Sequence, residues 1–194
     1  MRFDRFTGLA NTSSYTRRRS AEFAGSASDQ RRSGLTEMGR RWVRSMEARG
    51  MLIDLAHASS VTLREVTAMA TKPVIVSHTG VKGTCNNNRN LSDEELRAIA
   101  RTGGIVGIGY WETAVCGRDA RAIARAIQHA VKVVGAEHVA LGSDFDGAAT
   151  MPFDVNGVPL ITDALRRAGM SEHDMRLIMG ANVARVLSQT LPEP

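Results

Sequence analysis

The chain has 194 residues, enough for one sizeable domain, and its hydrophobic content of 43% is typical of a globular protein. No apolar stretch approaches the roughly 20 residues that a membrane-spanning helix needs, and the first thirty residues lack the apolar segment of a signal peptide. We therefore expect no membrane span. If Met1 is the true start, a cytoplasmic location is expected; otherwise the location stays unknown.

The net charge of +5 comes from the N-terminal part of the chain. Residues 1–50 hold eleven arginines against five acidic residues, whereas residues 51–194 hold fourteen basic against fifteen acidic residues. Residues 1–33 are also rich in Ser, Gly and Thr. This composition predicts a polar, Arg-rich, poorly ordered segment over 1–33 and a folded domain over 34–194, and it favours a solvated segment over a nucleic-acid partner.

The remaining chain predicts helices and strands in regular alternation. Thr36 opens an amphipathic helix that Gly50 closes, and Ser92 with Glu95 forms a capping box for another helix. Near-continuous apolar runs predict four parallel strands with both faces covered. The strands span 52–56, 74–77, 105–110 and 139–143, and the other helices span about 60–70, 119–134, 159–168 and 171–188.

Polar residues at the strand ends favour a (β/α)8-type barrel over a nucleotide-binding sheet. The first of these strands is followed by LAHASS instead of a G-x-G-x-x-G phosphate loop. His57 and His78 each close one of two consecutive strands. Because parallel strands lie about 4.8 Å apart, both imidazoles could bind one cation at about 2.0 to 2.1 Å. Ordinary hydrogen-bonded histidines at the rim are an equally plausible interpretation.

Further polar residues follow the later strands. Arg89 and Asn90 lie in the loop after the second predicted strand, and Asp144 and Asp146 lie in GSDFDG after the last one. An aspartate there could hold or deprotonate a metal-bound water, although Arg-Asn and DFDG are also common in ordinary loops and turns. The other three histidines, His129, His138 and His173, are predicted to be structural or superficial.

Cys85 and Cys116 follow two successive strands at the same predicted rim, so they could lie within disulfide reach. Without a secretory signal, two reduced thiols are the more common outcome. The sequence leaves both states open and favours the reduced one.

An ordered set of motifs resembles the membrane dipeptidase family, also called renal dipeptidases or peptidase family M19. The motifs are GLT-x-x-G from Gly34, MLIDLAH, KPVIVSHT, NRN, GGIVGI and GAEHVALGSDFDG. The resemblance runs from about residue 20 to 188. It implies a binuclear zinc hydrolase on a (β/α)8 barrel that cleaves the peptide bond of dipeptides, often with a D-residue in the C-terminal position.

The resemblance also implies roles for individual residues. His57 and His78 match the two histidines that bind one zinc ion, and Arg89 matches the residue that pairs with the substrate carboxylate, with Asn90 beside it as a second substrate-binding residue. Asp144 matches the catalytic acid that contacts the metal-bridging water and serves in proton transfer. Asp146 is expected to support the turn.

The family barrel is about twice as long as this chain, which corresponds to its C-terminal half. The early His-x-Asp pair, the glutamate that bridges both metals and a further substrate-binding histidine have no counterpart in the sequence. Of the two zinc ions, at most one would be partly liganded. We therefore expect a fragment or a truncated enzyme, whose activity alone is doubtful.

Two further functions stay open at this point. The chain could be a non-catalytic remnant or half-barrel interaction module, or, by fold analogy alone, another metal-dependent amidohydrolase acting on a lactone or cyclic amide. Expected partners are a dipeptide substrate and either a second copy of the chain or the missing N-terminal half.

Overall fold

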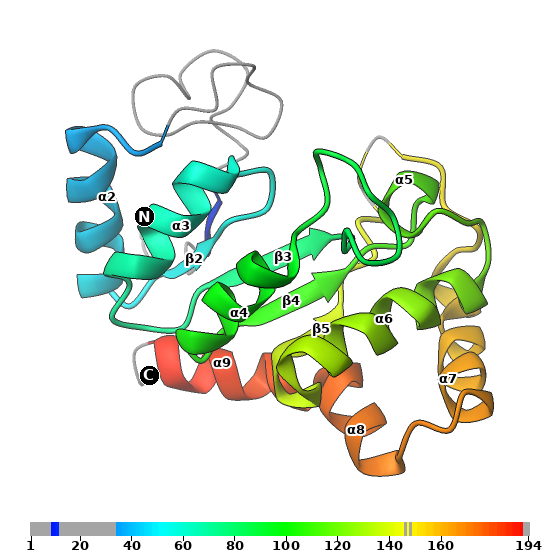
Figure 1. The fold of residues 1–194 in the computed structure, drawn as a ribbon. Helices are drawn as coiled ribbons and strands as arrows, with labels where there is room; N and C mark the ends of the chain where they lie inside the picture. The colour runs from blue at the N-terminus through cyan, green and yellow to red at the C-terminus, as the bar shows by residue number, and fades with distance from the viewer. Residues whose placement is uncertain (1–8, 12–33, 146, 148, 192–194) are drawn as a thin grey trace, which may run out of the picture.

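A computed structural model describes residues 9–11, 34–145, 147 and 149–191 of the chain. Within these residues, parallel strands form one five-stranded sheet in chain order (Figure 1). The strands are β1 (Leu9–Asn11), β2 (Leu52–Asp54), β3 (Ile75–Thr79), β4 (Ile105–Ile108) and β5 (Val139–Leu141). Consecutive strands that pair in parallel need a crossover each, and the helices between them supply it.

The helical segments follow the predicted alternation. The α-helices are α2 (Glu37–Ala48), α3 (Ser60–Met69), α4 (Asp93–Arg101), α5 (Glu112–Val115), α6 (Ala120–Val134), α7 (Val158–Arg167), α8 (Glu172–Arg176) and α9 (Asn182–Thr190). Short 3-10 turns η1 (Ala136–His138) and η2 (Val155–Gly157) and one π-helical segment η3 (Leu177–Ala181) join some of them.

The predicted helix starts are confirmed by their hydrogen bonds. The Thr36 side chain accepts from the Gly39 N–H at the start of α2, and Gly50 follows that helix with φ 70°. Ser92 and Glu95 form the complete capping box of α4, in which each side chain accepts from the main chain of the other. These caps satisfy the main-chain donors that the first turn of a helix leaves without an intrahelical partner.

Three parts of the fold differ from the sequence prediction, because β1 and α5 were not predicted and the last helix is divided. The four predicted strands correspond to β2 to β5, and β1 adds a strand that pairs with β2 from Leu9 opposite Leu52 to Asn11 opposite Asp54. The rest of the predicted poorly ordered segment lies outside the described residues. The helix predicted over 171–188 is divided into α8, η3 and α9, with Gly180 in a non-helical conformation inside η3.

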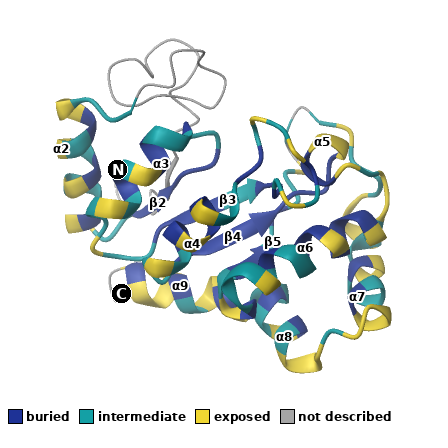
Figure 2. Cartoon of the chain, viewed as in Figure 1, coloured by how far each residue is buried: buried dark blue, intermediate teal, exposed yellow. Residues whose placement is uncertain are grey.

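The two faces of the sheet have different coverings. On one face, side chains such as Ile53, Val76 and Val106 belong to the main hydrophobic core, to which α3, α4 and α6 also contribute. On the opposite face, Leu52, Ile75, Ile105 and Ala140 form a smaller cluster with Val186 of α9. Figure 2 shows β2 and β4 as buried, β3 and β5 as mostly buried, and the outer surfaces of the helices as largely exposed.

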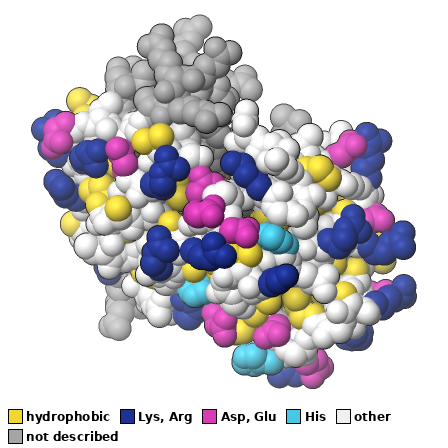
Figure 3. Space-filling model, in the orientation of Figure 1, with side chains coloured by type: hydrophobic (Ala, Val, Ile, Leu, Met, Phe, Trp, Pro, Cys, Tyr) yellow, Lys and Arg dark blue, Asp and Glu magenta, His cyan; other side chains and the backbone are white. Residues whose placement is uncertain are grey.

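None of the described helices is both long and apolar enough to cross a membrane. On the face drawn in Figure 3, the Lys and Arg side chains are interspersed with Asp and Glu side chains. On this face (Figure 3), basic and acidic side chains therefore do not separate into large patches of one charge.

Candidate active site

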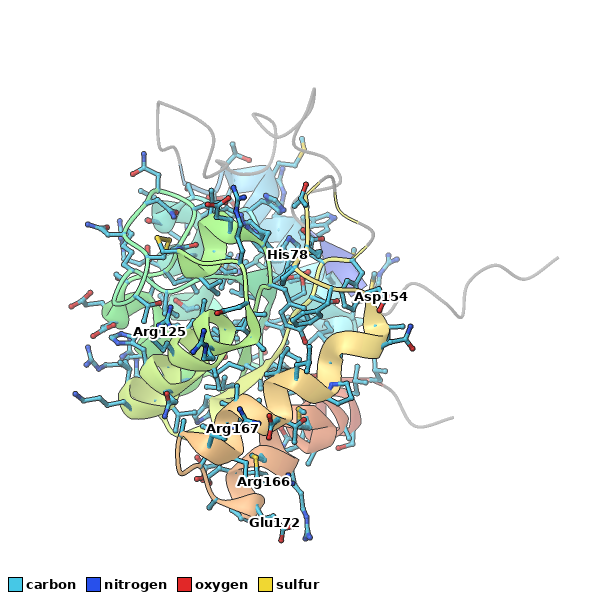
Figure 4. The ribbon with its side chains drawn as sticks, turned by 90° about the vertical axis from the view of Figure 1, so that its right-hand side faces the viewer. His78, Arg125, Asp154, Arg166, Arg167 and Glu172 are labelled. Carbon is cyan, nitrogen blue, oxygen red and sulfur yellow. A yellow bond between two sulfur atoms is a disulfide. The ribbon has the colours of Figure 1, made fainter. Side chains whose placement is uncertain are left out.

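The predicted site residues gather at the carboxyl edge of the sheet. His57 follows β2 by three residues, His78 lies in β3, and Asp144 follows β5 by three residues. Arg89 lies in the loop between β3 and α4. Because all strands run parallel, their carboxyl ends meet at one edge, which is where α/β barrels carry their sites. Figure 4 shows His78 at the end of the molecule opposite to Arg166, Arg167 and Glu172.

The two predicted metal-binding histidines face each other directly. The Nε2 atoms of His57 and His78 are 2.9 Å apart, and the ring centroids are 4.9 Å apart in an edge-on arrangement. Two imidazoles whose Nε2 atoms converge on one point could bind the same cation through these atoms. The structure therefore brings this predicted pair together.

The surroundings of His57 favour its neutral form. Burial lowers the pKa of His57 to about 4, and the nearby Arg89 and His78 act in the same direction. A neutral imidazole keeps a lone pair for a metal ion. His57 also has a φ of 66°, a left-handed conformation that few non-glycine residues adopt and that often marks functional sites.

The Nδ1 side of the His78 ring is connected to two other residues by hydrogen bonds. Its Nδ1 lies 2.9 Å from the hydroxyl of Ser77, which in turn donates to Oδ2 of Asp54 at 2.7 Å. Asp54 is fully buried at the end of β2, and its Oδ1 accepts from the N–H groups of Ser77 and Ala56, both at 3.0 Å. The sequence analysis missed Asp54, although a carboxylate inside the apolar run LIDLA was an available signal.

Asp144 reaches the same centre from β5. Its Oδ2 lies 3.9 Å from Nε2 of His78, and its backbone has a φ of 57°. Two of the three described non-glycine residues with positive φ are thus the site residues His57 and Asp144. Asp146, the predicted support of this turn, lies outside the described residues.

Arg89 points its guanidinium towards the histidine pair. Its Nη2 donates to the main-chain oxygen of His78 at 3.0 Å and lies 3.5 Å from Nε2 of His57, while its Nη1 donates to the Thr79 hydroxyl at 3.3 Å. The guanidinium carbon also lies 5.7 Å from the centre of the Trp111 ring, within cation–π range. Burial lowers the pKa of Arg89, and the carboxylates of Asp144 and Asp54 oppose this shift.

Asn90 faces away from these groups. It is 2% exposed, and its side-chain nitrogen donates to the main-chain oxygens of Cys85, Thr113 and Ala114. Its side-chain oxygen accepts from the Gly80 N–H at 3.1 Å. The predicted contact between Asn90 and a substrate finds no support in this geometry, because the amide is used to hold the loop that carries Arg89.

Cys85 and Cys116 are joined in a disulfide, which corrects the expectation of two reduced thiols. The bond connects the loop after β3 with the end of α5, where Cys116 has a φ of 50°. The other histidines are placed as predicted. Nε2 of His129 lies 2.7 Å from Asp93 Oδ1, Nδ1 of His138 lies 2.8 Å from the Gly104 oxygen, and His173 is exposed.

Two of the described residues could serve as ligands of a metal ion. Converging imidazole nitrogens suit Zn²⁺, for which nitrogen is a preferred ligand. Within the described residues, however, no group of three or more His, Cys, Asp or Glu side chains is arranged to hold a metal ion. His57 and His78 therefore fit zinc as two ligands of a site that needs further donors.

A parallel α/β sheet with imidazoles and a carboxylate at its carboxyl edge is typical of metal-dependent hydrolases built on (β/α)8 barrels. Residues 7–192 match the sequence pattern described as membrane dipeptidase (peptidase family M19), and the chain belongs to this family.

Related sequences support the same assignment. The chain is 33% identical over 164 residues to the "Uncharacterized protein in pqqA 5'region" of Klebsiella pneumoniae, covering 79% of this chain and 60% of that protein. It is 30% identical over 164 residues to Dipeptidase 3 of Rattus norvegicus, covering 81% of this chain and 33% of that protein. The chain thus spans less than two thirds of the length of these relatives.

Solved structures show the same fold. A metallo peptidase from Rhodobacter sphaeroides, crystallised with a phosphinate mimic of the dipeptide L-Ala-D-Ala, is 31% identical with a TM-score of 0.77, over 87% of this chain and 50% of that chain. The probable dipeptidase PvdM from Pseudomonas aeruginosa has a TM-score of 0.79 at 20% identity, over 87% of this chain and 59% of that chain. The described strands and helices therefore correspond to part of a larger barrel.

Proposed function

We propose that this chain carries the C-terminal half of a zinc-dependent dipeptidase site. The observation that carries the proposal is the 2.9 Å approach of the His57 and His78 Nε2 atoms at the carboxyl edge of the sheet. The chain's membership of the membrane dipeptidase family supports it, as does the likeness to a metallo peptidase that was crystallised with a dipeptide mimic.

Each residue has one task in this proposal. His57 and His78 would hold a zinc ion through Nε2, and the bound metal would polarise the peptide carbonyl and lower the pKa of a water molecule. Asp144, whose carboxylate lies 3.9 Å from His78 Nε2, would hold that water and accept its proton. Because Asp144 follows β5 whereas the histidines follow β2 and lie in β3, the sheet itself sets the distance between base and ligands.

Arg89 is proposed to bind the carboxylate of the substrate. Its guanidinium is half-buried beside the histidine pair, and among the described residues it lies within 4.0 Å of no carboxylate. A planar guanidinium can donate two parallel hydrogen bonds to one carboxylate. Asn90 would contribute indirectly, because its side chain holds the loop that carries Arg89.

The incomplete set of ligands favours a second candidate, a non-catalytic half-barrel. In the described part of the chain, no three His, Cys, Asp or Glu side chains are arranged to hold a metal ion, and catalytic zinc sites use three protein ligands with an open position. In this alternative, the metal and the activity would require a polypeptide that supplies the remaining ligands, either a second copy of the chain or the front half of the barrel.

Zinc binding and dipeptide hydrolysis test the proposal together. Titration of the metal-free chain with Zn²⁺ should show binding that His57→Ala and His78→Ala each abolish, whereas His173→Ala, on the exposed surface, should bind like the wild type. Release of free alanine from L-Ala-D-Ala then distinguishes the candidates. Zinc binding that is indifferent to both site histidines would refute the proposed site, and the absence of both zinc binding and hydrolysis would favour the half-barrel alternative.

A further inference from the structure

Behind His78 lies a chain of hydrogen bonds that runs from a buried carboxylate through a hydroxyl to the imidazole. Asp54 Oδ2, Ser77 Oγ and His78 Nδ1 are connected at 2.7 and 2.9 Å. Asp54 is fully buried, and the chain crosses from β2 to β3. We propose that Asp54 and Ser77 are positioning residues that fix the tautomer of His78, so that its Nε2 is unprotonated and faces the metal position. The part of this proposal that assigns Nε2 to a metal ion rests on the proposed function.

The direction of each hydrogen bond follows from the number of protons. A serine hydroxyl has one proton to donate, and an ionised carboxylate only accepts. Since Ser77 donates its proton to Asp54 Oδ2, its oxygen can only accept from His78. Nδ1 of His78 must therefore carry the proton of the 2.9 Å contact. In a neutral imidazole with Nδ1–H, the other nitrogen, Nε2, has the lone pair.

The backbone prevents Asp54 from turning away. Its Oδ1 accepts two main-chain hydrogen bonds at 3.0 Å, from Ser77 and from Ala56, so that Oδ2 is directed at the Ser77 hydroxyl. These contacts join the end of β2 to β3, the two strands that precede or carry the histidines.

This arrangement makes a specific prediction for Asp54→Asn. The two main-chain N–H groups require an acceptor at the Oδ1 position, so the amide oxygen must occupy it and the NH₂ group must face Ser77. Ser77 would then accept from the asparagine and donate its own proton to His78 Nδ1. The proton of His78 would move to Nε2, and that nitrogen would have no lone pair for a metal ion.

The experiment is a measurement of the ¹⁵N chemical shifts of His78 in the full, metal-free chain at about pH 8, where an ordinary histidine is neutral. The wild type should show a protonated Nδ1 and an unprotonated Nε2. Asp54→Asn should show the reverse, and Ser77→Thr, which keeps the hydroxyl, should resemble the wild type. A wild-type His78 protonated at Nε2 would overturn the proposal without any variant, as would an unchanged tautomer in a folded Asp54→Asn chain.

Metal affinity provides a second readout. Asp54→Asn and Ser77→Ala should weaken Zn²⁺ binding about 10- to 100-fold, the usual loss when a partner behind a histidine ligand is removed, and Ser77→Thr should restore it. Asp93→Asn is the matched control, because it disturbs another Asp–His pair, the contact with His129. It should change neither the tautomer of His78 nor the zinc affinity.

The tautomer and the proposed function can fail separately. The ¹⁵N shifts are read without metal and without substrate, so the expected tautomer together with an absence of hydrolysis would support the positioning role and count against the dipeptidase. Conversely, dipeptide hydrolysis by a chain whose His78 carries its proton on Nε2 would support the enzyme and overturn the positioning role.

Discussion

Arg89 and Asn90 are neighbours in sequence but have opposite surroundings. The Arg89 guanidinium lies beside the histidine pair and contacts the main chain of β3, whereas the Asn90 amide is buried against four main-chain groups. A charged, half-buried group next to the site suits ligand binding, and a buried amide with satisfied hydrogen bonds suits a structural role. Two predictions at the residue scale follow from this contrast.

Arg89→Lys should weaken the binding of a phosphinate mimic of L-Ala-D-Ala about tenfold or more, as measured by calorimetry in the presence of Zn²⁺. An ammonium keeps the charge but cannot donate the parallel pair of hydrogen bonds that a guanidinium offers a carboxylate. Arg118→Lys is the control, since the Arg118 side chain is 78% exposed. Equal affinity of the Arg89→Lys variant and the wild type would contradict the assignment of Arg89.

Asn90→Ala should lower the free energy of unfolding by about 2 to 4 kcal/mol, because it leaves several buried main-chain groups without their partner. Urea denaturation measures this loss. Asn88→Ala, at an exposed position two residues earlier in the same loop, should change the free energy of unfolding by less than about 0.5 kcal/mol. Similar losses in the two variants would show that Asn90 does not hold the loop.

At the scale of elements, the long loop from residue 80 to 91 between β3 and α4 has no regular secondary structure that would fix its conformation. It is fixed at three places: by the paired residues Val81 and Leu91, by Asn90, and by the disulfide from Cys85 to Cys116. The disulfide links this loop to α5, a short helix that the sequence analysis did not predict. The loop is thus held at three places, which suits a loop that presents a binding residue.

Removal of the disulfide by Cys85→Ala together with Cys116→Ala should lower the free energy of unfolding by about 3 to 4 kcal/mol, the chain-entropy effect of a cross-link between residues 31 apart. Thermal or urea unfolding under oxidising conditions measures it. A reducing agent should lower the stability of the wild type towards that of the double variant and leave the variant unchanged. A wild type that is equally stable under both conditions would contradict the presence of the bond.

Regular elements were predictable because their signals are local. The capping box of α4 and the cap of α2 depend on residues three positions apart, and the strands β2 to β5 are apolar runs between polar turns. The short strand β1 depends on tertiary contacts, whereas the break of the last helix at η3 coincides with the non-helical backbone of Gly180. A strand of three residues such as β1 forms by pairing with β2, and this pairing leaves no periodic pattern in the sequence.

For the whole molecule, the notable feature is the sheet face opposite the main core. Leu52, Ile75, Ile105 and Ala140 on this face meet Val186 of α9, and a cavity of about 220 Å³ lies beside them. In a closed barrel this face points inwards and is filled by side chains of all strands. Here α9 provides the apolar contact, which makes the C-terminal helix part of the core.

Val186→Ala should therefore lower the free energy of unfolding by about 1 to 3 kcal/mol, since it removes buried methyl groups and enlarges the cavity. Val155→Ala is the matched control, because Val155 does not line this cavity and is 67% exposed, whereas Val186 is 1% exposed. Chemical denaturation should separate the two variants. Equal stability of both would show that α9 does not pack on the sheet in solution.

By itself, the sequence determined the alternation of strands and helices, the helix caps, and the order of His57, His78, Arg89 and Asp144 along the chain. These features depend on local periodicity and on which residues follow each strand. Only the tertiary structure decided which atoms meet, because side-chain direction at a strand end depends on backbone conformation, such as the positive φ of His57 and Asp144. It turned Asn90 to the main chain, joined the two cysteines, and placed Asp54 and Ser77 behind His78.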